Sequence, residues 1–167
     1  MAHLNIEFKA VCSNISLAEE KLKKLAPRFM GTDLQRDTYY KVPKGRLKLR
    51  EGNIENALIY YERENKAGSK QSDVILFKHE PSPELKEILE KTHGIKTVIE
   101  KTRRIYFAEN VKFHFDVVNG LGEFIEVEAI DADGSIGREK LQQQCDHYAA
   151  FFEIRPEDFI SVSYSDM

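Results

Sequence analysis

Several segments of the chain alternate between apolar and polar residues with a period of two, which is typical of β-strands whose two faces meet different surroundings, and residues 57–63 and 74–78 are strand-like but mixed. In the first of them, every second residue from Leu4 to Ala10 is apolar, whereas the residues between them are polar or charged. The predicted strands cover residues 4–11, 46–50, 57–63, 74–78, 99–107, 112–118 and 124–130. The Asn119-Gly120 pair between the last two strands predicts a tight hairpin turn.

Three amphipathic helices are predicted between these strands, because apolar residues recur there with helical spacing. The first helix is expected over residues 17–29, where Ser16 and Glu19 match the pattern of a capping box. Its apolar stripe consists of Leu22, Leu25, Ala26 and Phe29.

The other two helices have clear boundary signals. Ser82 is the expected N-cap of the second helix, Pro83 occupies its first position, and Gly94 is the expected stop. Its apolar residues are Leu85, Ile88 and Leu89. The third helix is expected to begin near Ser135. Its stripe consists of Leu141, Cys145, Tyr148, Ala149 and Phe152.

The polar faces of the predicted strands are almost wholly ionic and mix both signs of charge, and two arrangements explain this. In the first, these faces meet solvent and form cross-strand ion pairs. In the second, they line the interior of a barrel, and the helices cover the apolar outer face. Pattern alone favours the first arrangement, since a charged interior is costly unless it meets an ion or a ligand.

Composition limits the cellular context and the partners of the protein. The chain has 167 residues and no internal repeat, and residues 64–73 form the clearest loop, so one domain over residues 1–167 is expected. The net charge of −3 argues against a generally basic nucleic-acid binder. Cys12 and Cys145 lack zinc-site spacing and are expected to be free thiols. Residues 1–9 alternate like a strand instead of forming a signal peptide, and no run approaches the ~18 apolar residues of a membrane span. A cytoplasmic protein without membrane or nucleic-acid partners is therefore expected.

Five short segments carry a more specific pattern. Residues 5–9 read Asn-Ile-Glu-Phe-Lys, close to a Glu-x-Glu-x-Lys strand but with Asn5 in place of the first glutamate. The other segments are residues 35–40, 45–50, 100–103 and 115–128, the last containing a Gly-Leu-Gly hairpin flanked by acids. In this order they resemble the CYTH superfamily, which includes class IV adenylyl cyclases and thiamine triphosphatases. The similarity is greatest to the branch that resembles class IV adenylyl cyclases.

This resemblance implies an α+β fold: a closed antiparallel β-barrel of about eight strands, with a charged lumen and with amphipathic helices packed outside. It therefore favours the second arrangement of the strand faces. It also implies action on triphosphate compounds with Mg²⁺ or Mn²⁺. The sequence is compatible with a homodimer.

Within this framework the resemblance and the strand spacing together indicate site residues. The expected metal ligands are Glu7, Glu126 and Glu128. Glu126 and Glu128 are two residues apart on one strand and hence share a face, and carboxylate oxygens are the ligands that hard divalent cations prefer. The expected phosphate-binding residues are Lys9, Lys48, Arg50, Arg63, Lys101 and Arg103. Glu7, Lys9, Asp116 and Glu126 are the candidate catalytic residues.

Two further residues on the strand before the hairpin have expected roles. Asp116 is expected to orient a Lys or Arg or to assist proton transfer, although nearby cations would lower its pKa and make it a poor general acid. His114 is expected to be structural and not a catalytic base.

These residues suggest several functions. The leading hypothesis is metal-dependent hydrolysis of inorganic, nucleoside or thiamine triphosphate. The first alternative is a class IV-type adenylyl cyclase that makes cyclic AMP from ATP. The second is a non-catalytic binder of polyphosphate or nucleotides, which the Asn5 replacement motivates. A barrel that carries an apolar ligand is a further alternative, against which the ionic strand faces argue.

Overall fold

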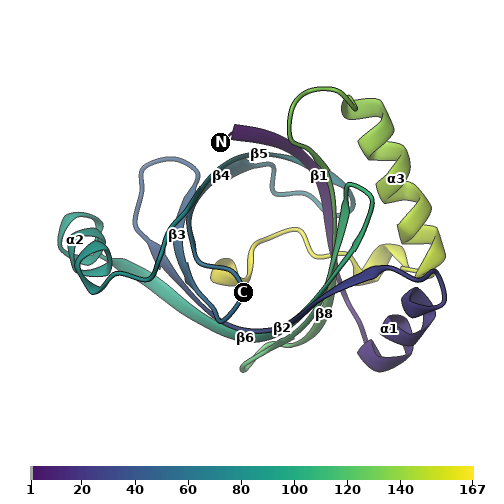
Figure 1. The fold of residues 1–167 in the computed structure, drawn as a ribbon, viewed down its shortest axis with the longest axis horizontal. Helices are drawn as coiled ribbons and strands as arrows, with labels where there is room; N and C mark the ends of the chain where they lie inside the picture. The colour runs from purple at the N-terminus through teal and green to yellow at the C-terminus, as the bar shows by residue number, and fades with distance from the viewer. Residues whose placement is uncertain (1) are drawn as a thin grey trace.

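Eight antiparallel strands close into a barrel in the computed structural model, which describes residues 2–167 (Figure 1). The strands are β1 (Ala2–Val11), β2 (Arg28–Tyr40), β3 (Arg46–Glu51), β4 (Ala57–Arg63), β5 (Lys70–Lys78), β6 (Ile95–Ala108), β7 (Val111–Val118) and β8 (Gly122–Asp131). Their order around the barrel is β1-β5-β4-β3-β2-β6-β7-β8, and β8 pairs with β1 to complete the ring. The closed antiparallel barrel expected from the sequence is confirmed.

The charged faces of the strands point into the barrel. On β1 the side chains of Asn5, Glu7 and Lys9 line the interior cavity. The alternate residues of the same strand, such as Ile6 and Phe8, are fully buried in an apolar cluster on the outside of the wall. The second arrangement, with a charged interior and a covered apolar exterior, is therefore the correct one.

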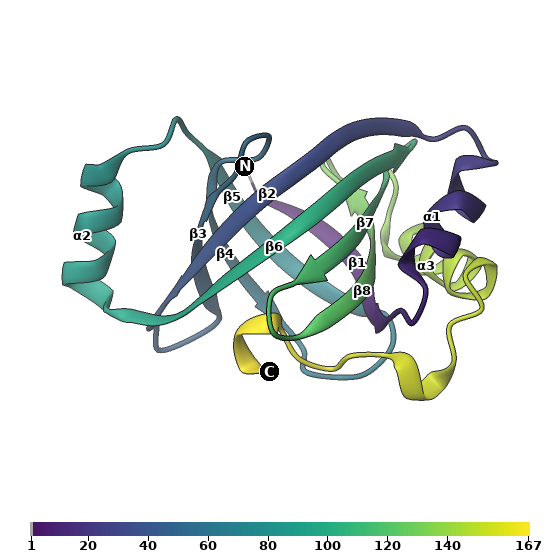
Figure 2. The same ribbon diagram turned by 90° about the horizontal axis from the view of Figure 1, so that it is seen from below.

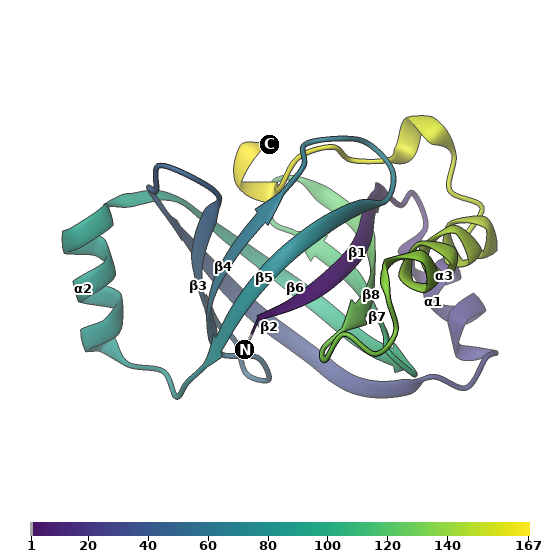
Figure 3. The same ribbon diagram turned by 90° about the horizontal axis from the view of Figure 1, so that it is seen from above.

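Two helices cover the apolar outer face of β1, β7 and β8: α1 (Ile15–Lys23) and α3 (Arg138–Phe151) (Figures 2 and 3). Leu22 of α1 and the Leu141 and Cys145 side chains of α3 are fully buried against Phe8 and Phe113 of the wall. The main hydrophobic core thus lies between the barrel wall and the helices, while the barrel interior is left for polar groups.

The third helix, α2 (Pro83–His93), packs on the opposite side of the barrel (Figure 1). Ser82 caps it as predicted, because its Oγ accepts a hydrogen bond from the Leu85 backbone N–H at 3.3 Å. Gly94 ends it with a φ of 74°, a conformation that favours glycine. Leu89 is buried in a small apolar cluster that also contains Leu49. None of the helices in residues 2–167 is long and apolar enough to cross a membrane.

The prediction for the first helix was wrong at both ends. The helix stops at Lys23, and residues 28–40 form β2, which pairs along its length with β6. Ala26 adopts a φ of 52° immediately before Pro27, so the chain turns there and cannot continue as a helix. The N-cap is Asn14, whose Oδ1 accepts from the Leu17 N–H at 3.0 Å, and not the expected capping box.

Three other boundaries also differ from the predictions. β5 begins at Lys70, so the loop is shorter than residues 64–73. β6 begins at Ile95, before the predicted residue 99. The third helix begins at Arg138, after Gly137, because both oxygens of Asp131 accept backbone N–H groups of the preceding loop and hold it as a turn.

The C-terminal segment crosses one end of the barrel, where Figures 1 to 3 place it over the opening. The Ile160 N–H donates to the Lys9 carbonyl at 2.8 Å. Further along, Asp166 forms ion pairs of 2.7 Å with both Arg46 and Lys96, and Tyr164 lies against Phe124 inside the barrel. This end is therefore closed by the chain itself.

The location of the main core leads to a stability prediction. Leu141→Ala should lower the free energy of unfolding by about 2–5 kcal/mol, because it opens a cavity beneath α3. Leu17→Ala on α1 is the matched control, since Leu17 is 65% exposed and the change should cost little. Urea denaturation of both variants measures this. Equal losses would contradict a core located between the helices and the barrel wall.

Candidate functional site

A cavity of about 100 Å³ lies inside the barrel and is lined mainly by charged side chains. The basic residues that line it are Lys9, Lys48, Arg50, Arg63, Lys101, Arg103 and Lys112. The acidic ones are Glu7, Glu55, Glu126 and Glu128. Seven basic side chains stand against four acidic ones on the lining, or six with the buried Asp37 and Asp116 that pair with these cations, which leaves a small excess of positive charge. Because such charges are costly away from water, this excess favours an anionic ligand.

The structure brings nearly all the residues predicted for the site to this one cavity. All the expected metal ligands and phosphate-binding residues line it. Asp116 is fully buried next to the lining, behind Arg103. Sequence reasoning missed three charged residues here: Asp37, Glu55 and Lys112. Lys112 shares the inward face of β7 with His114, so the period-two pattern could have identified it.

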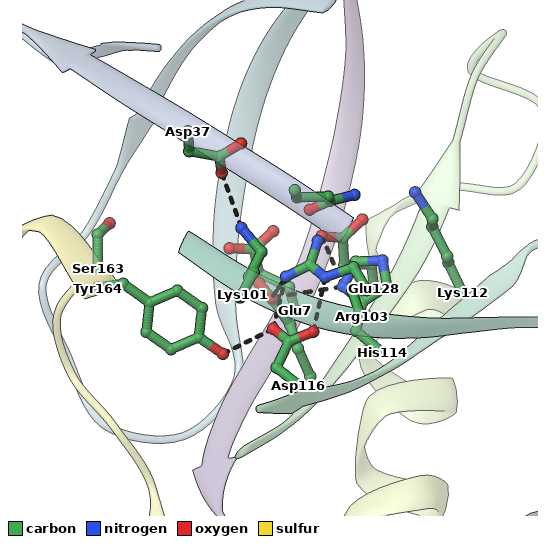
Figure 4. Close-up of polar contacts among 12 residues, drawn as sticks. Glu7, Asp37, Lys101, Arg103, Lys112, His114, Asp116, Glu128, Ser163 and Tyr164 are labelled. Carbon is green, nitrogen blue, oxygen red and sulfur yellow. Dashed lines mark hydrogen bonds and ion pairs between the residues drawn. The ribbon is translucent and has the colours of Figure 1, made fainter. Parts of the chain in front are cut away.

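Asp37 on β2 holds three of the basic residues in place, and Figure 4 shows its contact with Lys101. Arg50 donates to both of its oxygens, at 2.9 and 2.8 Å, Lys101 donates at 2.8 Å, and Lys48 lies 3.3 Å away. Burial would raise the pKa of Asp37, but the Arg50 and Lys101 cations hold it well below its usual range. Burial lowers the pKa of Lys101 to about 7, although Asp37 opposes this shift.

Asp116 on β7 positions a fourth basic residue. Both of its oxygens accept hydrogen bonds of 2.7 Å from Arg103, and Oδ2 also accepts the Tyr164 hydroxyl at 2.7 Å (Figure 4). Burial alone would raise the pKa of Asp116, but Arg103 lowers it to about 2. The carboxylate is therefore ionised at neutral pH and is suited to orienting Arg103, not to donating a proton.

A cluster of three glutamates and one histidine faces these cations from β1, β7 and β8. His114 Nδ1 lies 3.4 Å from Glu126 Oε2 and 3.9 Å from Glu128 Oε1. Glu7 stands directly opposite Glu128 in the register of β1 and β8, and accepts a 2.6 Å hydrogen bond from Arg63. Hence the expected metal ligands do share one region of the lumen.

Burial and the neighbouring charges shift the pKa values of these groups in different directions. Burial, together with the charges of Glu126 and Glu7, raises the pKa of Glu128 to about 7. Glu126 has a pKa well below its usual range, because Lys9 and His114 outweigh the effect of burial. Burial and Arg103 lower the pKa of His114 to about 3, so its imidazole is neutral. Carboxylate oxygens with a neutral imidazole form a donor set that fits a divalent cation.

The end of the barrel opposite the C-terminal segment opens into a second cavity of about 740 Å³. It shares Arg50, Glu55, Ile59 and Leu76 with the inner cavity, so the two adjoin. Met30, Ile54 and Phe107 give it a more apolar wall. A ligand can therefore place a charged end inside and an organic group at this mouth.

A closed antiparallel barrel with a charged lumen belongs to the tunnel type, which differs from small barrels filled by apolar side chains. Residues 3–152 match the family model of the CYTH domain, and the chain belongs to this family. The resemblance noted in the sequence is thereby confirmed. The C-terminal segment that closes the barrel lies beyond the matched residues.

Individual proteins with similar sequences or structures agree with this assignment. The chain is 25% identical over 173 residues to a candidate adenylate cyclase of Methanocaldococcus jannaschii, with 98% of each chain covered. The fold matches a protein from Pyrococcus horikoshii with a TM-score of 0.84, at 23% identity over 97% of this chain and 98% of that one. It also matches a candidate adenylyl cyclase from Hippeastrum, described as having a dominant triphosphatase activity, with a TM-score of 0.61, at 15% identity over 96% and 91% of the chains.

The lowered pKa of Asp116 leads to a prediction about acid stability. A carboxylate whose folded pKa is about 2 stabilises the fold above its unfolded pKa near 3.9, and this contribution is lost as the pH falls through the folded pKa. Wild-type protein should therefore lose about 2 kcal/mol from this group between pH 5 and pH 2. Asp116→Asn should be less stable at neutral pH and show a shallower acid decline. Urea titrations across this pH range measure both.

Asp73→Asn is the control for this prediction, since Asp73 is exposed on β5 and should leave the pH dependence unchanged. A decline in Asp116→Asn as steep as that of the wild type would show that the ion pair with Arg103 does not contribute to acid sensitivity.

Proposed function

We propose that this protein is a metal-dependent enzyme that hydrolyses a triphosphate compound inside the barrel lumen. The observation that carries the proposal is the cavity itself, where seven basic side chains face a cluster of carboxylates. A triphosphate carries several negative charges along a short chain, so it needs many cationic donors in one place. A divalent cation beside it needs carboxylate oxygens.

The basic side chains supply the phosphate-binding groups. Those proposed to contact phosphate oxygens are Lys9, Lys48, Arg50, Arg63, Lys101 and Arg103. Arg50 and Arg103 are each held by two hydrogen bonds to a buried aspartate, so their guanidinium groups are oriented before the ligand arrives. Such preorganised donors stabilise charge that develops during phosphoryl transfer.

The carboxylates supply the candidate metal ligands, Glu7, Glu126 and Glu128. A divalent cation held there would polarise a phosphoryl oxygen of the substrate. Glu7 accepts a hydrogen bond from Arg63 in this structure, and an incoming phosphate would compete for that guanidinium group. Lys9 lies over the Tyr164 ring, 3.6 Å from its centroid, and its ammonium group can donate hydrogen bonds to a phosphate.

In the proposed reaction a water oxygen attacks the terminal phosphorus, and the bond from this phosphorus to its bridging oxygen breaks. Orthophosphate and the remaining diphosphate leave, and one proton passes to solvent. The basic residues neutralise the charge on the leaving group. Asp116 acts only by positioning Arg103. The triphosphatase activity described for the Hippeastrum protein supports hydrolysis.

Cyclisation of ATP is the second candidate, and the outer cavity is the observation that favours it. In that reaction the ribose 3′-hydroxyl attacks the α-phosphorus, and pyrophosphate leaves. The cavity of about 740 Å³ at the open mouth has room for a nucleoside next to the charged lumen. The similarity to the candidate adenylate cyclase of M. jannaschii, which covers 98% of this chain, adds support.

A direct assay separates these functions. Purified protein is incubated with Mg²⁺ or Mn²⁺ and with inorganic triphosphate, ATP or thiamine triphosphate, and orthophosphate and cyclic AMP are both measured. We expect orthophosphate, and we expect Glu126→Gln to lower the rate by at least about a hundredfold, since it removes a charged ligand. Glu123→Gln, an exposed change on the same strand, should retain full activity.

Other outcomes of this assay have clear meanings. Cyclic AMP without orthophosphate would establish the cyclase. Thermal stabilisation by triphosphate without turnover would indicate a binding protein, a reading consistent with Asn5 at the first motif position. If neither turnover nor stabilisation occurs, the lumen is not a triphosphate site.

A further inference from the structure

A buried histidine lies inside the carboxylate cluster, and its one hydrogen bond to residues 2–167 is a long one. His114 is 1% exposed. Its Nδ1 is 3.4 Å from Glu126 Oε2, longer than the usual range for N–H···O contacts. Its Nε2 is buried and has no hydrogen-bond partner among residues 2–167. Buried polar atoms are normally paired at shorter distances, so the long contacts of Nδ1 with Glu126 and Glu128 leave a place for an ion between them.

The spacing of the donor atoms fits a shared ion. One donor atom each from His114, Glu126 and Glu128 can be chosen so that all three lie within 4.8 Å of one another. Ligands that sit about 2.1 Å from one metal ion are separated from each other by about 3.0–3.5 Å. The observed separations of 3.4 and 3.9 Å from Nδ1 to the two carboxylates need only small side-chain shifts to reach this range.

The strands hold these three side chains in place. His114 and Glu126 are direct partners in the register of β7 and β8, and Glu128 follows two residues later on the same face. Ligands on paired strands are more precisely placed than ligands on loops. Figure 4 shows His114 and Glu128 pointing into the same part of the lumen, beside Arg103.

One neighbouring cation, Arg103, contacts a carboxylate of this cluster but is held mainly by another one. Arg103 Nη2 contacts Glu126 at 3.1 Å, but the same guanidinium makes two shorter bonds of 2.7 Å to Asp116. It can therefore release Glu126 and stay anchored. Lys112 is paired with Glu55, and Arg63 is paired with Glu7, so their charges are already directed to other carboxylates.

We propose that His114 is a nitrogen ligand in a metal site completed by Glu126 and Glu128, and that this site prefers a first-row transition ion such as Mn²⁺, Co²⁺ or Zn²⁺ to Mg²⁺. Mg²⁺ strongly prefers oxygen ligands and retains several waters. An imidazole nitrogen instead suits transition ions. The catalytic role of this metal rests on the proposed function, whereas the binding of the metal by these three residues does not depend on it.

The test measures metal binding without any triphosphate, so it does not depend on turnover. Mn²⁺, Co²⁺, Zn²⁺ and Mg²⁺ are each titrated into the metal-free protein in a calorimeter. We expect at least one transition ion to bind about tenfold or more tightly than Mg²⁺. His114→Gln should weaken that binding by about tenfold or more and change Mg²⁺ binding far less. His147→Gln, on α3 and outside the lumen, is the matched control.

A second measurement needs no variant and remains valid if His114→Gln does not fold. Bound Co²⁺ is paramagnetic, so the ring protons of a ligating histidine shift strongly in the NMR spectrum of the wild-type protein. We expect one such set of signals. Absence of these signals, equal affinity for Mg²⁺ and the transition ions, or no metal binding at all would overturn the proposal. Metal binding as described with no turnover of any triphosphate would instead contradict only the proposed function.

Discussion

The ion pairing around Asp37 and Asp116 is the constraint on which the rest of the structure depends. These two fully buried carboxylates bind Arg50, Lys101 and Arg103 in a lumen where unpaired charges would be costly. The three cations that these aspartates hold also line the cavity, so they remain next to its interior. A barrel interior that would otherwise need an apolar core can therefore remain polar and ready for an anion.

A polar interior requires the apolar packing to lie elsewhere, and this explains the positions of the helices. α1 and α3 bury the outer faces of β1, β7 and β8, while α2 covers a smaller cluster on the other side. The C-terminal segment crosses one end, where the Tyr164 hydroxyl donates a hydrogen bond to Asp116, and the adjoining outer cavity lies at the other end.

Alternation along β1, β7 and β8 made the strands and their two faces predictable, since those strands separate charged from apolar surroundings. It could not decide which face pointed inward, and the family resemblance was needed for that. β2 was missed because residues 28–34 do not alternate cleanly, and its pairing with β6 overrides local preference. Asp37 lies on this strand and was therefore missed as a site residue. His114 was expected to be structural because one strand cannot show which carboxylates lie across from it.

The most direct test of the account is a crystal structure of the protein with inorganic triphosphate and a divalent cation. The account predicts phosphate oxygens within hydrogen-bond distance of Arg50 and Arg103, with Asp37 and Asp116 still holding these guanidinium groups from behind. It also predicts the cation beside Glu126. Triphosphate bound on the outer surface, or an unchanged lumen at saturating ligand, would contradict the claim that the interior charges form its binding site.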